Sequence, residues 1–269
     1  MSDTVSSTFD LPVRRAAAGA ADAAAPISEA EWAVRRDLAA AYRLCALFGW
    51  DDLIYTHLSA RVPGTEDQFL VNPLGLGFDE INASNLIKID LDGRMLSDSA
   101  HAPNAAGFVI RGGIHMARHD AACVMHLHTE AGMALSCLKD GLLPLTQHAM
   151  RFVGRIGYHD YDGIALGTGE RERLVADLQG KAALVLRNHG TITVGASVGH
   201  AFVETFYLEK AARAQFMALS SGAAIHHPDP EVVALTARQW QADHDRNSGP
   251  REWPHLLRRL ERIAPDYRL

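Results

Sequence analysis

The segment that most constrains the fold is an apolar run that carries two histidines. Residues 121–127 are apolar except for His126, and His128 follows directly. Side chains alternate between the two faces of a β-strand, so His126 and His128 are expected on the same face, one strand repeat apart. Two imidazoles at this spacing can share one metal ion, or each can be satisfied by ordinary hydrogen bonds. Because His-x-His is a short and common pattern, the pair alone leaves both interpretations open.

The composition indicates an ordinary globular protein. Hydrophobic residues make up 48% of the 269 residues and charged residues 22%, which suffices to bury a full core. The net charge is −6 and no basic run alternates with aromatic residues, so nucleic acid is not an expected partner. No stretch approaches the roughly 18 apolar residues of a membrane span, so no membrane partner is expected. The three cysteines, Cys45, Cys123 and Cys137, are widely spaced in apolar contexts, which favours reduced thiols and a cytoplasmic location.

Helical and strand patterns follow one another along most of the chain. Residues 1–26 are poor in large apolar side chains, so we expect a disordered tail and then a single domain over residues 27–269. Ser28 and Glu31 have capping-box spacing and Gly49 suits a left-handed cap, which predicts a helix between them. The order of elements predicts one α/β domain whose helices cover a central sheet. Strands are expected at 58–62, 69–71, 86–91, 121–127 and 181–187, strands and loops within 142–165, and further helices at 103–118, 129–138, 170–178, 197–220, 228–245 and 252–263.

A third histidine stands where a buried strand is expected to end. His189 follows the apolar residues 181–187 and lies between Asn188 and Gly190, so we expect a loop to present it. If this strand lies near the first, His126, His128 and His189 form three neutral ligands with at least one open coordination position, as in catalytic metal sites. The alternative is a histidine satisfied by hydrogen bonds to its neighbours.

Four segments of the chain resemble the class II aldolase/adducin family. They are residues 48–57, 69–75, 124–128 and 187–190, and the resemblance runs from about residue 30 to 265 with motif order and spacing in agreement. It implies a three-layer α/β/α sandwich with a central, mostly antiparallel sheet. It also implies one divalent metal ion per subunit, Zn²⁺ or Mn²⁺, and usually a homotetramer with sites near subunit interfaces. The implied metal ligands are His126, His128 and His189.

Two departures from the family pattern bear on the reaction. Family aldolases that act on sugar phosphates carry Gly-Asn where this chain has Thr56 and His57, and Ser-Ser-Glu where it has Ala105, Ala106 and Gly107. The missing Asn and serines are phosphate contacts, and the missing Glu is the general acid/base. The chain therefore does not resemble a sugar-phosphate aldolase most closely. It resembles an adducin-like bacterial branch that includes metal-dependent decarboxylases of aromatic or pyridine carboxylates.

The chemistry of such a site narrows the substrate class. Decarboxylation needs an electron sink and a late protonation, and a divalent ion held by three neutral imidazoles keeps a charge that favours a small anionic substrate. Arg111, one helical turn after Gly107, could hold a carboxylate through its planar fork or lie solvated on the helix surface. His57 is a candidate for proton transfer, and a loop histidine bonded to backbone is the alternative.

The remaining candidates line the expected pocket or lie outside it. Asn72, Gly75, Gly107 and Tyr161 are the predicted substrate-binding residues. Glu204 and Glu209, on the helix expected at 197–220, are predicted to be solvated or paired and not catalytic, and Tyr267 is a candidate to reach a neighbouring subunit.

The predicted function is a metal-dependent carbon–carbon lyase acting on a small hydroxylated carboxylate, with decarboxylation favoured over aldol cleavage. The alternatives are an aldolase or epimerase on a hydroxy-carbonyl compound, and a non-catalytic adducin-like binding protein.

Overall fold

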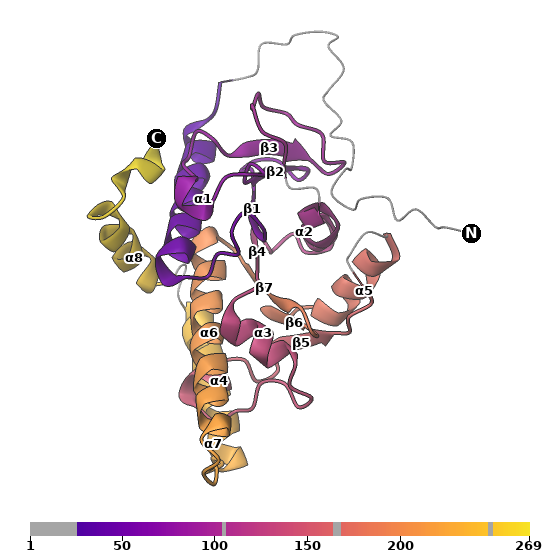
Figure 1. Ribbon diagram of the computed structural model, residues 1–269, viewed down its shortest axis with the longest axis vertical. Coiled ribbons are helices and arrows are strands. Elements are labelled where there is room, and N and C mark those ends of the chain that lie inside the picture. Colours follow the sequence, from indigo (N-terminus) through magenta and orange to yellow (C-terminus); the bar gives the residue numbers. More distant parts are fainter. Residues whose placement is uncertain (1–25, 104–105, 164–167, 247–249) are drawn as a thin grey trace.

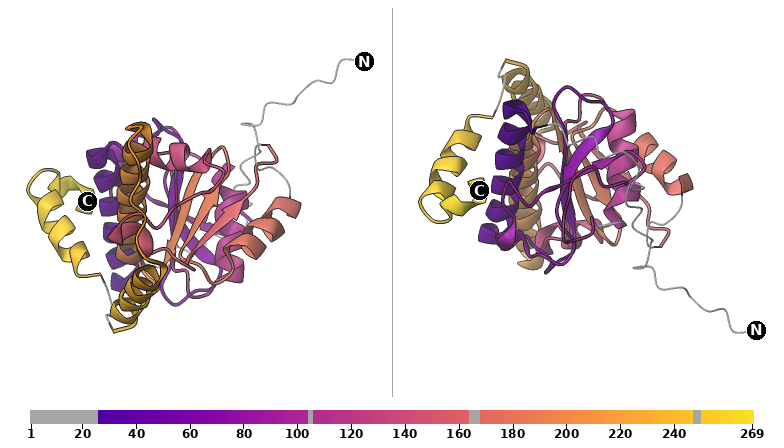
Figure 2. Two further views of the ribbon diagram at one scale, coloured as in Figure 1. Left: turned by 90° about the horizontal axis from the view of Figure 1, so that it is seen from below. Right: turned by 90° about the horizontal axis from the view of Figure 1, so that it is seen from above.

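A computed structural model of the chain describes residues 26–103, 106–163, 168–246 and 250–269. Helices lie on both faces of a central sheet, and the two views of Figure 2 show the three layers edge-on. This confirms the expected α/β fold with a mostly antiparallel sheet. The tail expected over residues 1–26 falls outside the described residues except for its last position.

The sheet has seven strands in the order β3-β2-β1-β4-β7-β6-β5. Neighbouring strands are antiparallel except β5 and β6, which run parallel. The strand that carries the two histidines, β4, lies at the centre, so its ends are surrounded by protein. The strands are β1 (His57–Arg61), β2 (Gln68–Val71), β3 (Ile87–Asp90), β4 (Cys123–Leu127), β5 (Ile156–His159), β6 (Ala183–Leu186) and β7 (Gly190–Gly195).

Two sets of helices form the outer layers (Figure 1). The long helices α1 and α6 lie on one face with α3, and α2 and α5 pack together on the other. The helices are α1 (Glu29–Phe48), α2 (Ala106–Ala117), α3 (Glu130–Ser136), α4 (Gln147–Met150), α5 (Thr168–Leu178), α6 (Val198–Ser220), α7 (Pro230–Arg246) and α8 (Glu252–Glu261), with short 3-10 turns η1 (Phe78–Glu80) and η2 (Pro265–Arg268). Among the described residues, no helix combines the length and apolar character needed to cross a bilayer.

The first helix has the ends that its sequence predicts. The Ser28 side chain accepts a hydrogen bond from the Glu31 backbone N–H, and Gly49 closes the helix with a left-handed φ of 68°. The buried Tyr42 hydroxyl then ties this helix to the sheet, because it donates to the Leu58 carbonyl at 2.6 Å and accepts from the Leu58 N–H at 2.7 Å. Helix α1 therefore fixes the position at which β1 begins.

The structure differs from the predicted pattern after His189. The residue patterns predict no strand there, yet β7 follows at once and pairs with both β4 and β6. Ile192 and Val194 join an apolar cluster, while Thr193 donates a hydrogen bond to the Ala201 carbonyl of α6. Threonines on one face and aliphatic residues on the other give a strand that is buried on both sides. The middle section also contains a short helix, α4, where only strands and loops are expected.

Candidate metal centre

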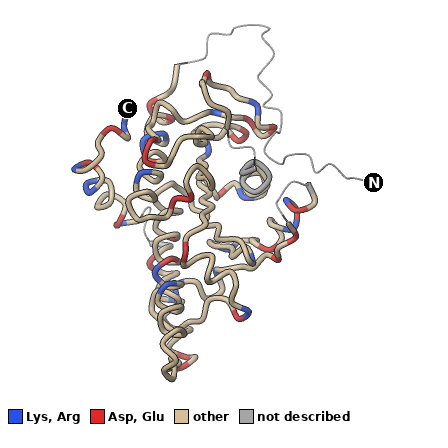
Figure 3. The backbone as a smooth tube through the Cα atoms, viewed as in Figure 1, with Lys and Arg blue, Asp and Glu red and all other residues tan. Residues whose placement is uncertain are grey.

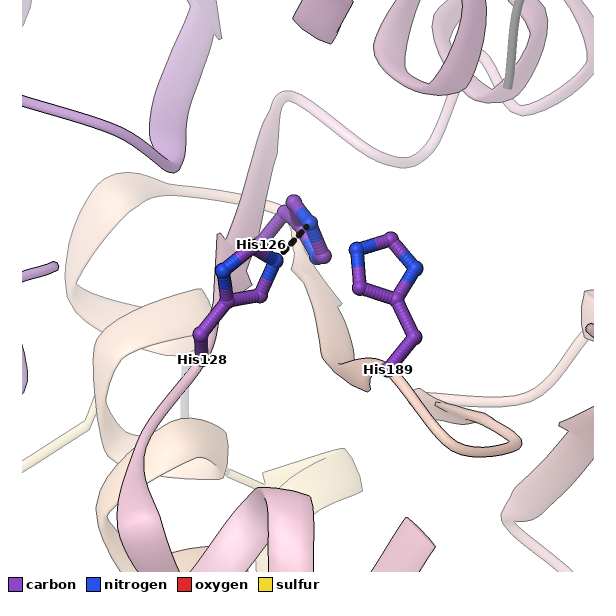
Figure 4. A group of neighbouring side chains, drawn as sticks. All are labelled: His126, His128 and His189. Carbon is purple, nitrogen blue, oxygen red and sulfur yellow. Dashed lines mark hydrogen bonds between the residues drawn. The ribbon is translucent and has the colours of Figure 1, made fainter. Parts of the chain in front are cut away.

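Three histidines from two neighbouring parts of the sheet gather at one point (Figure 4). His126 and His128 lie at the end of β4, and His189 lies in the turn between β6 and β7. Because Leu127 pairs with Thr191 across β4 and β7, the turn is held beside the end of β4. The candidate ligand nitrogens all lie within 4.8 Å of one another. The sheet therefore brings together the three predicted metal ligands.

The residues on either side of His189 explain why the turn can approach so closely. Asn188 has a left-handed φ of 55°, a conformation that Asn tolerates better than most residues. At Gly190 an added Cβ would lie 2.5 Å from the Leu127 carbonyl oxygen and 3.0 Å from the His128 ring. A side chain at residue 190 would therefore push the His189 turn away from β4.

Hydrogen bonds determine which ring nitrogens face the centre. The Thr191 carbonyl can only accept, so His126 donates its Nδ1–H to it at 3.1 Å. His128 likewise donates Nδ1–H to the Asp52 carboxylate at 2.8 Å. Both Nε2 atoms are then left with lone pairs, and these atoms lie 3.0 Å apart. Two facing lone pairs repel unless a proton or a cation lies between them.

Protonation is an unfavourable way to relieve that repulsion here. Burial, reinforced by the neighbouring His128 and His189, lowers the pKa of His126 well below its usual value. Burial, with His128 and His159 nearby, lowers the pKa of His189 to about 4. These two rings are therefore neutral near pH 7, which is the form that coordinates a metal. Three converging imidazoles, two of them neutral, suit a divalent ion.

Asp52 is a site residue that the sequence reasoning does not single out. It lies in the loop between α1 and β1, and its carboxylate supports His128 from outside the histidine cluster. The same loop contains two non-glycine residues with left-handed backbone, Leu53 (φ 52°) and Thr56 (φ 61°). Such conformations cost free energy and concentrate at functional sites. The only sequence signal for Asp52 is its place inside segment 48–57, which resembles the family.

Asn72, a predicted substrate-binding residue, and Thr56, which is not a predicted site residue, are buried polar groups with spare hydrogen-bonding capacity. Asn72 is fully buried, and its Oδ1 lies 3.0 Å from the Tyr42 hydroxyl oxygen. Its Nδ2 and the Thr56 Oγ1 have no hydrogen-bond partner among the described residues. The His57 ring centroid lies 5.2 Å from that of His126. Buried donors of this kind are expected to meet a ligand or an ordered water.

Other predicted residues lie at the rim or outside the described side chains. Tyr161 is 51% exposed with its ring centroid 6.1 Å from that of His189, and Gly75 has a left-handed φ of 96°. Gly107 and Arg111 lie in α2, but their side-chain positions fall outside the described part of the chain, so the expected carboxylate clamp stays a prediction.

Glu204, Glu209 and Tyr267 are all buried. Glu204 is paired, as expected, with Arg151 and Arg155 at 2.9 Å each. Glu209 accepts a hydrogen bond from the Thr129 hydroxyl, and burial raises its pKa to about 7. Tyr267 is 2% exposed within the core of its own subunit, so it is not placed to reach a neighbour.

Comparison with known proteins identifies one family over most of the chain. The model of the "Class II Aldolase and Adducin N-terminal domain" matches residues 36–216. A Caulobacter vibrioides relative named "Putative aldolase class 2 protein" is 49% identical over 241 residues, covering 90% of this chain and 94% of that protein. Rat alpha-adducin is 41% identical over 212 residues, which cover 78% of this chain but 28% of the adducin.

Solved structures give the same result. The aldolase II superfamily protein from Pseudomonas syringae superposes with a TM-score of 0.87 at 51% identity, covering 91% of this chain and 98% of that one. L-fuculose 1-phosphate aldolase from Glaciozyma antarctica superposes with a TM-score of 0.78 at 29% identity, covering 90% and 93%.

Proposed function

The chain belongs to the class II aldolase and adducin family, and on that premise we propose that it is a divalent-metal-dependent carbon–carbon lyase for a small hydroxylated carboxylate. Decarboxylation is the favoured reaction. The observation that carries the proposal is the partly buried pair of Nε2 atoms, 3.0 Å apart, with both Nδ1 atoms engaged elsewhere.

The proposed ligands of the ion are His126, His128 and His189. Zn²⁺ and Mn²⁺ both accept imidazole nitrogen, so the donor set fits either. A bound divalent ion supplies a Lewis acid that polarises a substrate oxygen. The histidines supply no negative charge, so the site favours an anionic ligand.

Residues around the histidines would orient that substrate. The Asn72 amide and the Thr56 hydroxyl have buried, unsatisfied atoms that suit the oxygens of a hydroxy acid. Tyr161 would cover the opening beside His189, and Arg111 would pair with a carboxylate. His57, next to His126, is the candidate for proton transfer near the β1 end of the site.

Decarboxylation is favoured because of a residue that the chain lacks. Retro-aldol cleavage needs a base for a hydroxyl proton, and Gly107 stands where family aldolases carry the Glu that serves this purpose. Loss of CO₂ does not need that first proton transfer. The likeness to L-fuculose 1-phosphate aldolase supports cleavage of a hydroxy-carbonyl compound as the second candidate.

The proposal extends to assembly and location. Phe216, Met217 and Leu219, near the end of α6, are 52%, 65% and 42% exposed, which supports burial against further copies in a homotetramer. Acidic and basic residues are interspersed along the described chain (Figure 3). The partner that we propose is a small anion. The three free cysteines support a cytoplasmic location.

Metal analysis combined with a carboxylate panel tests the function. We expect about one Zn²⁺ or Mn²⁺ per subunit, and CO₂ release from at least one hydroxylated aliphatic or aromatic carboxylate that is lost on chelation and regained with metal. His126→Ala is expected to abolish both metal binding and turnover, while the exposed His226→Ala keeps both. Turnover that survives in His126→Ala contradicts the proposal. Metal content near zero favours an adducin-like binding protein, and cleavage of phosphorylated hydroxy-carbonyl compounds favours an aldolase.

A further inference from the structure

A small cavity lies against the candidate metal centre on the side of α5. His189, His159, Tyr161 and Glu170 are among the residues that line it. Its volume of about 10 Å³ leaves room for about one water molecule. A water held there would lie in a cavity that the proposed ligand His189 lines.

His159 is held so that one ring nitrogen faces this cavity. The residue ends β5 and is 5% exposed. Its Nδ1 donates to the Asp177 carboxylate at 2.7 Å. Its Nε2 lies 3.8 Å from the Glu170 carboxylate, beyond hydrogen-bond length, and has no hydrogen-bond partner among the described residues. Since Glu170 lines the cavity and Asp177 does not, Nε2 is the nitrogen directed into it.

The backbone around His159 is built to hold this pair of residues together. β5 runs parallel to β6, and the Arg187 N–H donates to the His159 carbonyl at 2.8 Å. Helix α5 lies so close to β5 that a Cβ at Gly157 would meet the Asp177 carbonyl oxygen at 2.5 Å. The glycine thus allows the helical turn that carries Asp177 to lie directly over the strand that carries His159.

We propose that His159, oriented by Asp177, delivers the proton that the reaction consumes, through one water in this cavity. The inference rests on the proposed function and assigns the proton of its last step to His159 in place of His57, the candidate named above for proton transfer. When the bond to CO₂ breaks, its electron pair stays on the substrate carbon. The water gives a proton to that carbon and takes one from His159 Nε2, which keeps its Nδ1–H bond to Asp177. A proton from solvent then returns to Nε2, so no oxidant or reductant is needed.

Replacement of either partner tests the route in the full-length, metal-loaded protein. His159→Asn and Asp177→Asn are compared with His226→Asn, an exposed histidine outside the site. Metal content and calorimetric binding of oxalate, a carboxylate probe that needs no proton, are expected to match wild type in all three. On the carboxylate that the wild type turns over, we expect kcat to fall about 100-fold or more in His159→Asn and about tenfold in Asp177→Asn. KM is expected to stay within about threefold.

A second measurement separates proton delivery from a structural role. The deuterium content of the product formed in an equal mixture of H₂O and D₂O depends on which group donates, so it is expected to change in His159→Asn and not in His226→Asn. In the ¹⁵N spectrum of the wild type, His159 Nδ1 is expected to carry a proton. The proton route is wrong if that nitrogen is bare, or if His159→Asn keeps wild-type kcat and product deuterium content. Failure of the proposed function looks different, because then the wild type itself releases no CO₂ from any carboxylate of the panel.

Discussion

Removal of the Asp52 carboxylate should weaken metal binding without removing any proposed ligand. Asp52 accepts the Nδ1–H of His128 at 2.8 Å and so holds that ring with Nε2 toward the centre. Loss of such a supporting contact typically weakens metal affinity 10- to 100-fold. The Asp52 side chain is 42% exposed and that of His128 is 23% exposed, so water can partly replace the lost acceptor. We therefore expect Asp52→Ala to weaken binding about tenfold, or about 1.4 kcal/mol.

The affinity is measured by competition with a chelator of known strength, for Zn²⁺ and Mn²⁺ separately. Asp51→Ala is the matched control, since Asp51 is the exposed neighbour in the same loop. Asp52→Asn keeps an acceptor oxygen but loses the charge, so its affinity is expected to lie between wild type and Asp52→Ala.

Equal affinities in Asp52→Ala and Asp51→Ala would refute the argument, because the ring of His128 would then be held by something other than Asp52. A loss above about 1000-fold would refute it as well, since a supporting contact would then be as important as a ligand.

Three further perturbations have expected outcomes in stability. The pKa of Glu209 is about 7 in the folded protein against an ordinary value of 4.5, so the folded state binds more protons than the unfolded state between these two pH values. The free energy of unfolding therefore falls as pH rises through this range, by up to about 3 kcal/mol. Urea unfolding at pH 5 and 7.5 should show this loss, and Glu209→Gln should remove it. Gly190→Ala is expected to destabilise the chain by about 2–4 kcal/mol, because the added Cβ meets the Leu127 carbonyl oxygen; an unchanged urea midpoint would contradict the close approach. Tyr42→Phe is expected to cost about 1–3 kcal/mol, because it removes the buried hydroxyl that accepts from the Leu58 N–H and donates to the Leu58 carbonyl; thermal unfolding measures the loss.

The elements that the sequence predicts well are those with local signals. The first helix carries its own caps at Ser28 and Gly49, and the structure has both. The histidine strand is an apolar run that needs no partner to be recognised. In contrast, the four residues after Gly190 alternate threonine with aliphatic side chains, which is a strand signal but a very short one. Their pairing with β4, which lies far away in the sequence, makes them one.

The candidate site shows the same difference between residues that have a local sequence signal and residues that have none. The spacing of His126 and His128 fixes their shared face, and the motif around His189 indicates a presented histidine. Asp52 and His159 depend instead on where a loop and a helix come to lie. Asp52 reaches His128 through a loop with two left-handed residues, and Asp177 reaches His159 because α5 packs against β5 at Gly157. Neither contact has a sequence spacing that predicts it.

The pairing of β4 with β7 also determines the order in which the centre can form. His126 and His128 leave the ribosome long before His189, and only the β6–β7 turn brings the third imidazole beside them. A nascent chain that ends before His189 holds at most a two-histidine site, and such a site binds metal weakly. Under the proposed function, the ion is therefore bound after the sheet has closed. The bound ion then links the two halves of the sheet through their histidines. The chain can accordingly fold first, and the metal that it binds is then determined after folding.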